Sequence, residues 1–512
     1  MHKFNLNYQS KTKPLKPYWN FCVGSCHATT ALRMDYRQQL EKCQRELGFQ
    51  YVRFHGLFDD DMSVMKKSHV LGKIEDEFIF SFTNIDSIFD FLLSINMKPF
   101  IEIGFMPECL KTKDTTVFHY KGYTSKPYDY QMWNHLIDIF TRHLVDRYGL
   151  DEVRRWFFEV WNEPNLGGKD SPDGFWTESM EEYFKLYENT ARTLKKVDHG
   201  IKVGGPATSN NAWIPEFTGF CQENQVPVDF ISTHHYPTDV ILGYGVEDSV
   251  NFFQHQEGET LEAYEKRQQE WFAHIWEEVD RGVLTEMTKK AVMQANGLPV
   301  YYTEWNSLAG LPSDGSFGSS FILKTILDSS DLVEGYSYWT FSDIFEEGGM
   351  PNSEFHGGFG LMTMHGIPKA SYRAFEILTG LGNEMYEKTY EKDTVDIYAL
   401  KKTKSNLVQF LAVNHHSLLH EIKEEKISIQ IENLPLSECK TEIIRLDESH
   451  GNAIEAWRNM GEPDYPDKSQ MAILEAASFL KREAVEATTE NGALIIKTSI
   501  PPQGAVLIQV YL

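Results

Sequence analysis

The stretch Trp161-Asn162-Glu163-Pro164-Asn165 determines the fold prediction, and it follows directly on the apolar run Trp156-Phe157-Phe158-Glu159-Val160. That run is short, rich in aromatic residues and stopped by a proline, which is typical of a buried strand that ends at a site. A second strand-like run, Pro299-Val300-Tyr301-Tyr302-Thr303, delivers Glu304 to its own C-terminal end. The sequence therefore places a glutamate at the end of each of two buried strands, where a solvated side chain would be out of place.

Strand-like and helix-like segments alternate through most of the chain. Strands are expected at 21–24, 51–55, 99–104, 156–160, 201–206, 228–234, 299–303 and 335–339. Helices are expected at 35–47, 85–95, 130–148, 180–197, 213–224, 261–296 and 321–327. Eight such strand–helix units predict an α/β fold, a (β/α)8 TIM barrel with insertions. A doubly wound open sheet is the alternative, but no glycine-rich phosphate turn follows the first strand.

The pattern changes after Gly382, where short apolar strands separated by turn residues replace the alternation. Strands are expected at 395–400, 407–413, 427–431, 494–498 and 505–510, with a helical insertion at 471–482. This pattern indicates a β-sandwich that supports the barrel or provides an oligomer surface. We therefore divide the chain into a barrel at 17–382, a sandwich at 383–512 and an N-terminal segment at 1–16 that could pair with the sandwich.

Composition argues against several classes of function. The chain has 512 residues and a net charge of −25, which disfavours binding to nucleic acid or to an anionic membrane surface. The N-terminus shows no apolar signal-peptide region, and no stretch approaches the length needed to span a bilayer. The six cysteines are sparse and irregularly spaced, so we expect reduced thiols rather than disulfides or a metal site.

The two glutamates are expected at the C-terminal ends of the fourth and seventh barrel strands, where such barrels carry their reactive groups. Glu163 and Glu304 would then face one cleft. Two facing carboxyls suit the hydrolysis of a glycosidic bond: one protonates the leaving oxygen, and the other attacks the anomeric carbon. A nearby carboxylate raises the pKa of the acid and keeps it protonated near neutral pH. This chemistry needs no cofactor and no metal.

The Asn-Glu-Pro after the fourth strand and the Thr-Glu-Trp at the end of the seventh resemble the retaining glycosidases of clan A, and most of all glycoside hydrolase family 39. The best-known bacterial members of that family are β-xylosidases. The resemblance covers nearly the whole chain, including the trailing sandwich. It implies that Glu163 is the acid/base, that Glu304 is the nucleophile, and that Asn162 binds the 2-hydroxyl of the sugar.

The resemblance also implies a set of substrate-binding residues. They are Arg53, His55, Asn162, Phe175, His234, Tyr236, Trp339, Glu346 and Glu347. In the family, the strand-2 arginine holds the nucleophile ionised, the tyrosine lies near the nucleophile, the strand-8 tryptophan lies beneath the sugar, and the paired acidic residues take sugar hydroxyls. Strand alternation adds that His234 and Tyr236 face the same side, so that His235 faces away.

Several of these residues have an ordinary structural alternative. Arg53 could form a surface ion pair, Trp339 could pack in the core, and the pair Glu346–Glu347 could be solvated. The loop at 167–174 is longer than the corresponding loop of the bacterial members of that family. The sequence therefore does not define the side of the site that would hold the leaving group, the aglycone. The excursion at 238–258 has no assigned role.

The sequence therefore predicts an exo-acting, retaining β-xylosidase that releases xylose from the non-reducing end of β-1,4-xylo-oligosaccharides. The alternatives within the clan are a β-glucosidase, an arabinosidase, an endo-xylanase and an α-L-iduronidase, the last disfavoured because Glu346 and Glu347 would repel a uronic acid. A non-catalytic sugar-binding protein is disfavoured because both glutamates are present. A metal-dependent hydrolase is disfavoured because only the histidine pair could supply ligands. We expect a cytoplasmic enzyme that acts on small oligosaccharides and, by family analogy, forms a homo-oligomer.

Overall fold

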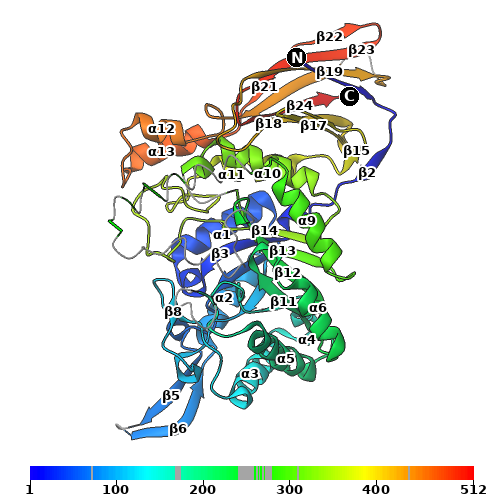
Figure 1. Cartoon of the computed structure of the whole chain (residues 1–512). Coiled ribbons are helices and arrows are strands. Elements are labelled where there is room, and N and C mark those ends of the chain that lie inside the picture. The colour runs from blue at the N-terminus through cyan, green and yellow to red at the C-terminus, as the bar shows by residue number, and fades with distance from the viewer. Residues whose placement is uncertain are drawn as a thin grey trace.

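The computed structural model of the chain describes most of its residues. The described residues are 1–70, 73–167, 174–239, 259–260, 263, 266–267, 270, 279–307, 311–435 and 439–512. Most of the loop predicted at 167–174 and of the excursion predicted at 238–258 lies outside the described residues. The described part consists of a barrel and a mainly β module stacked on one side of it (Figure 1).

Eight parallel strands close into a barrel, as the sequence predicts. In chain order they are β3 (Cys22–His27), β4 (Tyr51–His55), β7 (Lys98–Ile103), β10 (Phe157–Val160), β11 (Lys202–Thr208), β12 (Phe230–His235), β13 (Val300–Trp305) and β14 (Gly335–Tyr338). Each strand pairs with its neighbours in this order, and β14 pairs with β3 to complete the ring. All eight C-terminal ends therefore meet at one rim, where the polar residues of the predicted site are expected.

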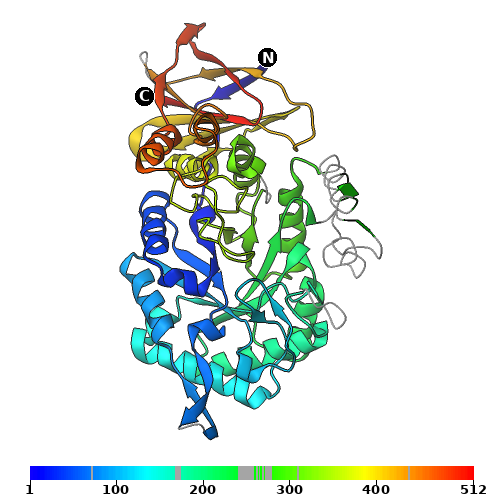
Figure 2. The ribbon, with the colours of Figure 1, turned by 90° about the vertical axis from the view of Figure 1, so that its left-hand side faces the viewer.

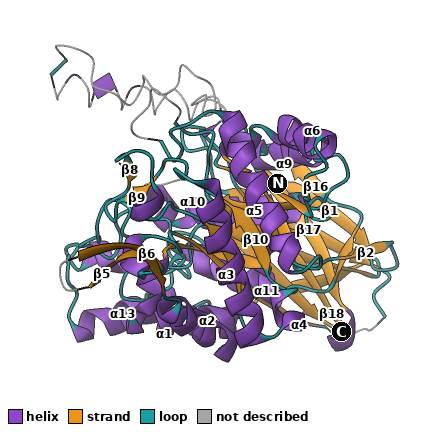
Figure 3. Ribbon diagram, turned by 90° about the horizontal axis from the view of Figure 1, so that it is seen from below, coloured by secondary structure: helices purple, strands orange, loops and turns teal. Residues whose placement is uncertain are grey.

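Helices cover the outside of the barrel (Figure 3). They are α1 (Met34–Leu47), α2 (Thr83–Ser94), α3 (Tyr130–Tyr148), α4 (Leu150–Val153), α5 (Met180–Val197), α6 (Ile214–Glu223), α9 (Val283–Gln294), α10 (Ser316–Asp328) and α11 (Ala370–Gly380). Gly48 ends α1 with a φ of 76°, the left-handed conformation of a glycine C-cap. The continuous helix predicted at 261–296 is wrong, because residues 279–282 are not helical and α9 begins only at Val283.

Helix α10 begins earlier than predicted and is buried on nearly every side. Every residue from Ser316 to Leu327 is buried, because α10 packs on α11 and on β18 (Leu407–Asn414) and β24 (Gly504–Tyr511) of the other module. Its first turns contain small residues such as Gly318 and Ser319, which lack the apolar periodicity that marks a helix in sequence. The helix therefore joins the two parts of the molecule.

Aromatic side chains close the N-terminal end of the barrel. Residues Phe21, Tyr51, Phe100, Phe157, Phe230 and Tyr301 pack there into one cluster. Phe100 and Phe157 are aligned in register on β7 and β10, and their rings stack with centroids 5.2 Å apart. Because these large rings fill the bottom of the barrel, a small molecule could reach its interior end only from the opposite, C-terminal rim.

The C-terminal module contains two sheets that pack face to face, as predicted for a sandwich. One sheet has the order β1 (His2–Asn7), β19 (Glu425–Glu432), β23 (Ala493–Ile500) and β22 (Ala487–Glu490). The other has the order β2 (Thr12–Pro14), β15 (Glu384–Tyr386), β17 (Val395–Lys402), β18, β24, β20 (Lys440–Leu446) and β21 (Arg482–Ala484), and β16 (Tyr390–Lys392) pairs with β17. Phe4 of β1 meets Phe410 of β18 between the sheets, with ring centroids 6.2 Å apart.

The first strand of the chain belongs to this module. β1 pairs in parallel with β19, from His2 opposite Ile427 to Asn7 opposite Glu432, and its side chains alternate between buried and exposed. β2 pairs with β15, so both ends of the chain lie in the same module (Figure 2). The polypeptide thus enters the barrel from the sandwich and returns to it.

Several elements were not predicted. β20 lies between β24 and β21, and two hairpins extend from the barrel: β5 (Met65–Val70) with β6 (Lys73–Phe80), and β8 (Thr116–Val117) with β9 (Gly122–Tyr123). The helix predicted at 471–482 is instead α13 (Lys468–Ser478), preceded by α12 (Ile454–Asn459) and followed by β21. Among the described residues, no helix is both long enough and apolar enough to cross a membrane.

Candidate active site

The C-terminal rim of the barrel brings Glu163 and Glu304 together. Glu304 lies within β13, and Glu163 follows β10 in a tight turn with a φ of 42°. Trp161 also has a positive φ, 74°, and the Glu163 amide donates to the Ala207 carbonyl at 2.8 Å. One oxygen of each carboxyl and Nδ1 of His234 all lie within 4.8 Å of one another. This sparsely populated backbone conformation turns the chain so that Glu163 faces Glu304.

Glu304 receives hydrogen bonds from two side chains. Arg53 Nη1 donates to its Oε1 at 2.8 Å, and the Tyr236 hydroxyl donates to its Oε2 at 3.1 Å. Burial raises the pKa of Glu304, and the positive charge of Arg53 opposes that rise. Because both contacts are donors, they favour the ionised carboxylate, which is the form that can act as a nucleophile.

Glu163 lies in a different environment. Burial raises the pKa of Glu163 well above its usual value, and the negative charge of Glu304, joined by that of Asp239 when Asp239 is ionised, raises it further. Its Oε1 is 3.0 Å from Nδ1 of His234. Burial lowers the pKa of His234 well below its usual value, so this ring is neutral and supplies no compensating charge. These surroundings favour a proton on Glu163 rather than on Glu304, which is the state that a general acid requires.

Arg53 is completely buried among carboxyl groups. Its Nε donates to Glu159 Oε2 at 2.5 Å, and its Nη2 lies 2.9 Å from Glu102 Oε2. Nη2 also donates to Asn162 Oδ1 at 3.0 Å. The alternative of a surface ion pair for Arg53 is therefore wrong, since its guanidinium lies inside the barrel. There it contacts both Glu304 and Asn162 and fixes their orientation.

His55 and Trp339 lie next to each other on the nucleophile side of the rim. Their ring centroids are 4.6 Å apart, and Trp339 is almost fully buried directly after β14. His55 Nδ1 is 2.7 Å from Glu102 Oε2, and its Nε2 is 3.7 Å from a carboxyl oxygen of both Glu304 and Glu347. Burial lowers the pKa of His55 to about 3, so this ring is also neutral. Trp339 thus packs in the barrel and borders the site at once.

The adjacent residues Glu346 and Glu347 are half-buried rather than solvated. Glu346 Oε1 is 2.8 Å from Nδ1 of His27, whose contact lowers the pKa of Glu346. Burial raises the pKa of Glu347 well above its usual value, and the charge of Glu304 adds to this. His27 stacks on the ring of Tyr120 at 3.7 Å and 5°. Glu346 therefore favours the ionised form, which only accepts hydrogen bonds, whereas Glu347 favours the protonated form, which can also donate one.

Phe175 and the histidine pair complete the predicted set. Phe175 packs against Phe118 with ring centroids 5.3 Å apart, and its carbonyl accepts from Trp161 Nε1 at 2.7 Å. His234 faces the two glutamates, as Tyr236 does, whereas the buried His235 ring has no hydrogen-bond partner within the described part of the chain. The structure therefore brings every predicted residue to one rim, with Phe175 at its outer wall.

Sequence reasoning missed several polar residues of the same site: Glu102, Glu159, Thr303, Asp239 and His27. Glu102 and Glu159 are single charged residues inside apolar strand runs, and this signal could have identified them, because an unpaired charge is rarely buried. Asp239 accepts from the Tyr236 amide at 2.8 Å, and burial raises the pKa of Asp239 to about 8. Nothing in the sequence around Asp239 predicts that burial.

Two groups of side chains bring three possible metal ligands within 4.8 Å of one another. They are Glu163–His234–Glu304 and His27–Asp59–Asp61. In the first group, the atoms that could bind a metal already take part in the hydrogen bonds described above. In the second, His27 Nε2 lies 3.2 Å from Asp59 and 3.6 Å from Asp61. Burial lowers the pKa of His27, but Asp59, Glu346 and Asp61 together outweigh it and raise that pKa to about 9. Contacts among the side chains therefore account for both groups.

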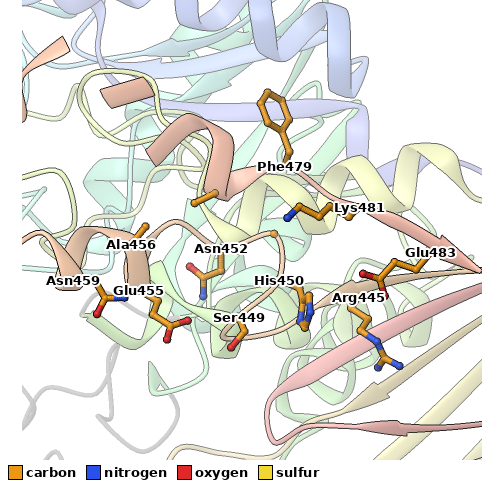
Figure 4. A pocket seen from close by; sticks show the side chains of 12 residues that line it. Arg445, Ser449, His450, Asn452, Glu455, Ala456, Asn459, Phe479, Lys481 and Glu483 are labelled. Atoms are coloured by element: carbon orange, nitrogen blue, oxygen red, sulfur yellow. The ribbon is translucent and has the colours of Figure 1, made fainter. Parts of the chain in front are cut away.

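A separate hollow lies in the C-terminal module. It has a volume of about 280 Å³ and lies between the α12–α13 region and the β20–β21 end of the sheet (Figure 4). Its walls include Arg445, Asn452, Glu455 and Lys481. No residue of the predicted site lines it, and the glutamate pair is at the barrel rim. This hollow is therefore separate from the candidate active site.

The fold and the site together define a glycoside hydrolase on a (β/α)8 barrel. The family model described as "Glycosyl hydrolases family 39" matches residues 2–495. The chain therefore belongs to glycoside hydrolase family 39, as the sequence motifs predict.

Individual relatives agree with this assignment. The chain is 45% identical to "Beta-xylosidase" of Caldicellulosiruptor saccharolyticus, over 99% of this chain and 98% of that protein. It is 36% identical to "Beta-xylosidase" of Geobacillus stearothermophilus, over 90% of this chain and 86% of that protein. The solved structure of a monomeric beta-xylosidase from Caulobacter crescentus CB15 has 30% identity and a TM-score of 0.80, and the match covers 100% of this chain and 99% of that one.

Proposed function

We propose that this enzyme is an exo-acting, retaining β-xylosidase that releases xylose from the non-reducing end of β-1,4-xylo-oligosaccharides. The observation that carries the proposal is the distance of at most 4.8 Å between oxygens of Glu163 and Glu304. Retaining glycosidases have carboxyls about 5–5.5 Å apart, whereas inverting enzymes need about 6.5–9.5 Å to admit a water molecule. The relatives described as β-xylosidases support the choice of xylose.

The reaction has two steps. Glu304 attacks the anomeric carbon while Glu163 gives its proton to the leaving oxygen, which forms a covalent glycosyl-enzyme. Esterification removes the negative charge of Glu304, so the pKa of Glu163 falls toward the value of a general base. Glu163 then takes a proton from water, and the resulting hydroxide displaces Glu304 and releases the sugar with retained configuration. The two carboxyls supply the acid, the base and the nucleophile, so we propose no cofactor and no metal.

The other predicted residues bind the glycone. Arg53 has only donors and contacts Asn162 Oδ1, so the amide nitrogen of Asn162 is the group that can reach the 2-hydroxyl. His55, Trp339, Glu346 and Glu347 border the nucleophile side, where the sugar ring has to lie. Two carboxyl groups there disfavour a negatively charged uronic acid, the substrate type of an iduronidase.

We further propose that residues 17–382 carry out the reaction, with 1–16 and 383–512 as supporting module. We predict that the enzyme acts in the cytoplasm on imported oligosaccharides. We also predict that it assembles into a homo-oligomer. A relative from Caulobacter crescentus is described as monomeric. Size-exclusion chromatography with light scattering tests the assembly.

Nitrophenol release from aryl β-D-xylosides, beside aryl glycosides of glucose, arabinose and iduronic acid, tests the substrate. Turnover of the xyloside that is lost in Glu304→Ala would support the reaction and the nucleophile. An initial β-anomer of xylose, seen by NMR before mutarotation, would support retention. Preference for another glycone would overturn the assignment to xylose, and an initial α-anomer would overturn the retaining mechanism.

A further inference from the structure

A continuous chain of hydrogen bonds runs beneath the two glutamates. Glu304 accepts from Arg53 Nη1, and the same guanidinium donates through Nε to Glu159 Oε2. The Thr303 hydroxyl is 2.7 Å from the other oxygen of Glu159, Oε1, and His234 Nε2 is 3.1 Å from that hydroxyl. His234 Nδ1 is 3.0 Å from Glu163, and this last contact completes the connection. All of these side chains are buried.

The direction of each hydrogen bond can be deduced from its partners. Arg53 has only N–H donors, so Glu159 is an acceptor at that contact and pairs with it as a carboxylate. The hydroxyl of Thr303 then donates its single proton to Glu159, and its oxygen is free only to accept. His234 must therefore carry its proton on Nε2 and donate it to Thr303. A neutral imidazole has one N–H, so Nδ1 of His234 is left with a lone pair.

We propose that Glu159 and Thr303 are positioning residues that fix the tautomer of His234 and thereby assign the proton of the catalytic pair to Glu163. A lone pair on Nδ1 can accept a hydrogen bond only from a protonated Glu163. An ionised Glu163 would face that lone pair without a donor, which disfavours the carboxylate and makes it a more effective base in the second step. This inference rests on the proposed function for the roles of Glu163 and Glu304.

Other charged groups also face Glu163 and must be separated from this effect. They are Glu304 on β13, Asp239 after β12, Arg53 on β4 and Glu347 after β14. Arg53 and His55 face His234, and Glu304 Oε2 lies 3.7 Å from its Nδ1. None of them contacts Thr303 in the hydrogen bonds described above, so a change confined to Thr303 alters the chain while these neighbours remain. A change at Glu159 also removes the charge that pairs with Arg53, and the Thr303 variants separate the two effects.

The decisive variant is Glu159→Gln, which keeps the shape of the side chain. Its amide oxygen must face Arg53, so its NH2 group donates to Thr303, and Thr303 must then donate to His234 Nε2. The tautomer reverses, and an N–H on Nδ1 of His234 stabilises ionised Glu163. We expect the basic limb of the kcat/KM pH profile on an aryl xyloside to move to lower pH by about one unit. Thr303→Val should move it in the same direction, and Thr303→Ser should keep the wild-type limb.

Ring ¹⁵N NMR of histidine-labelled protein reads the tautomer without any activity. The His234 signal is assigned by its loss in His234→Gln. We expect a proton on Nε2 in the wild type and on Nδ1 in Glu159→Gln. Protonation at Nδ1 in the wild type would overturn the proposal, as would an unmoved basic limb in both Glu159→Gln and Thr303→Val. If the wild type does not hydrolyse xylosides, the proposed function fails, but the NMR result still tests the hydrogen-bond chain.

Discussion

At the scale of single residues, Glu163 and Glu304 show how surroundings separate two identical side chains. Both are buried at one rim, yet Glu304 accepts hydrogen bonds from Arg53 and Tyr236, whereas Glu163 contacts a neutral histidine. Donors and a positive charge favour the carboxylate, and burial beside another carboxylate favours the protonated form. These contacts support the proposed assignment of Glu163 as the acid and Glu304 as the nucleophile.

The proposed role of Glu163 as the acid predicts a dependence on the leaving group. In Glu163→Ala, kcat/KM for xylobiose should fall by about 10²–10⁴-fold, because an alkoxide leaves poorly without a proton. For 2,4-dinitrophenyl xyloside, whose leaving group needs no proton, kcat/KM should change much less. Glu304→Ala is the matched control and should lose activity on both substrates. Equal losses on the two substrates in Glu163→Ala would argue against its role as the acid.

Asp239 predicts a change at alkaline pH. Burial raises the pKa of Asp239 to about 8, so its carboxyl is mostly neutral below that pH and gains its charge above it. The new charge raises the pKa of Glu163 and delays its ionisation. Asp239→Asn should therefore match the wild type near pH 6–7. On the basic side of the profile, its kcat/KM should begin to fall at a lower pH than that of the wild type. A full pH profile checks this, and an unchanged basic limb would contradict it.

These residues also show what could be predicted from the sequence. Glu163 and Glu304 could be placed at one rim because parallel barrel strands end together, and His234 and Tyr236 could be placed on one side because strand residues alternate. Asp239 and Thr303 could not be assigned, because their roles depend on partners from other strands. Hydrogen-bond direction becomes visible only when those partners are in contact.

At the scale of elements, the barrel depends on how closely β3 approaches β14. Tyr338 pairs with Val23, and a Cβ on Gly24 would lie 2.4 Å from Cε3 of Trp339. Gly24 therefore lets the tryptophan ring lie against the strand. The strand register was predictable in outline, but this contact was not, since a glycine in a strand run has no sequence signal for its neighbour.

Gly24→Ala should displace the ring of Trp339, which we propose borders the glycone site. A misplacement of about 1 Å can cost roughly 10²-fold in rate, and overpacking costs about 1–3 kcal/mol. We expect kcat/KM on an aryl xyloside to fall strongly while the protein stays folded by circular dichroism. Gly219→Ala on α6 is the control: its Cβ meets nothing within 4 Å, so activity should be kept. Full activity in Gly24→Ala would show that Trp339 tolerates displacement.

Predicted elements were most reliable where periodicity was strong. The predicted helix at 130–148 has the bounds of α3, and the strand at 51–55 has those of β4. β20 was missed because Lys440, Glu442 and Arg445 interrupt its apolar residues, although Ile443 and Leu446 are buried. Its place in the sheet comes from pairing with β24, a long-range contact that local sequence does not encode.

At the scale of the whole molecule, the barrel and the C-terminal module share buried ionic contacts as well as α10. Asp396 on β17 pairs with Arg281, before α9, and lies 3.5 Å from Nζ of Lys324 on α10. Lys324 and Asp396 are each only 2% exposed. Lys324 also pairs with Asp328 on its own helix at 2.5 Å, so Asp396 is the partner that connects Lys324 and Arg281 to the C-terminal module. The sequence predicted two domains but could not predict which charges would join them.

Asp396→Ala should therefore destabilise the whole molecule, since it leaves Arg281 and Lys324 with less compensation. Removing one partner of a buried ion pair costs about 3–5 kcal/mol, which denaturant unfolding can measure. The control is Lys13→Ala, which breaks the pair with Asp331, whose two side chains are about 40% exposed, and should cost less than about 1 kcal/mol. Activity at 25 °C should persist in both variants, because neither residue belongs to the rim. If Asp396→Ala unfolds like its control, the buried pair does not hold the module to the barrel, and the apolar faces of α10 must do so alone.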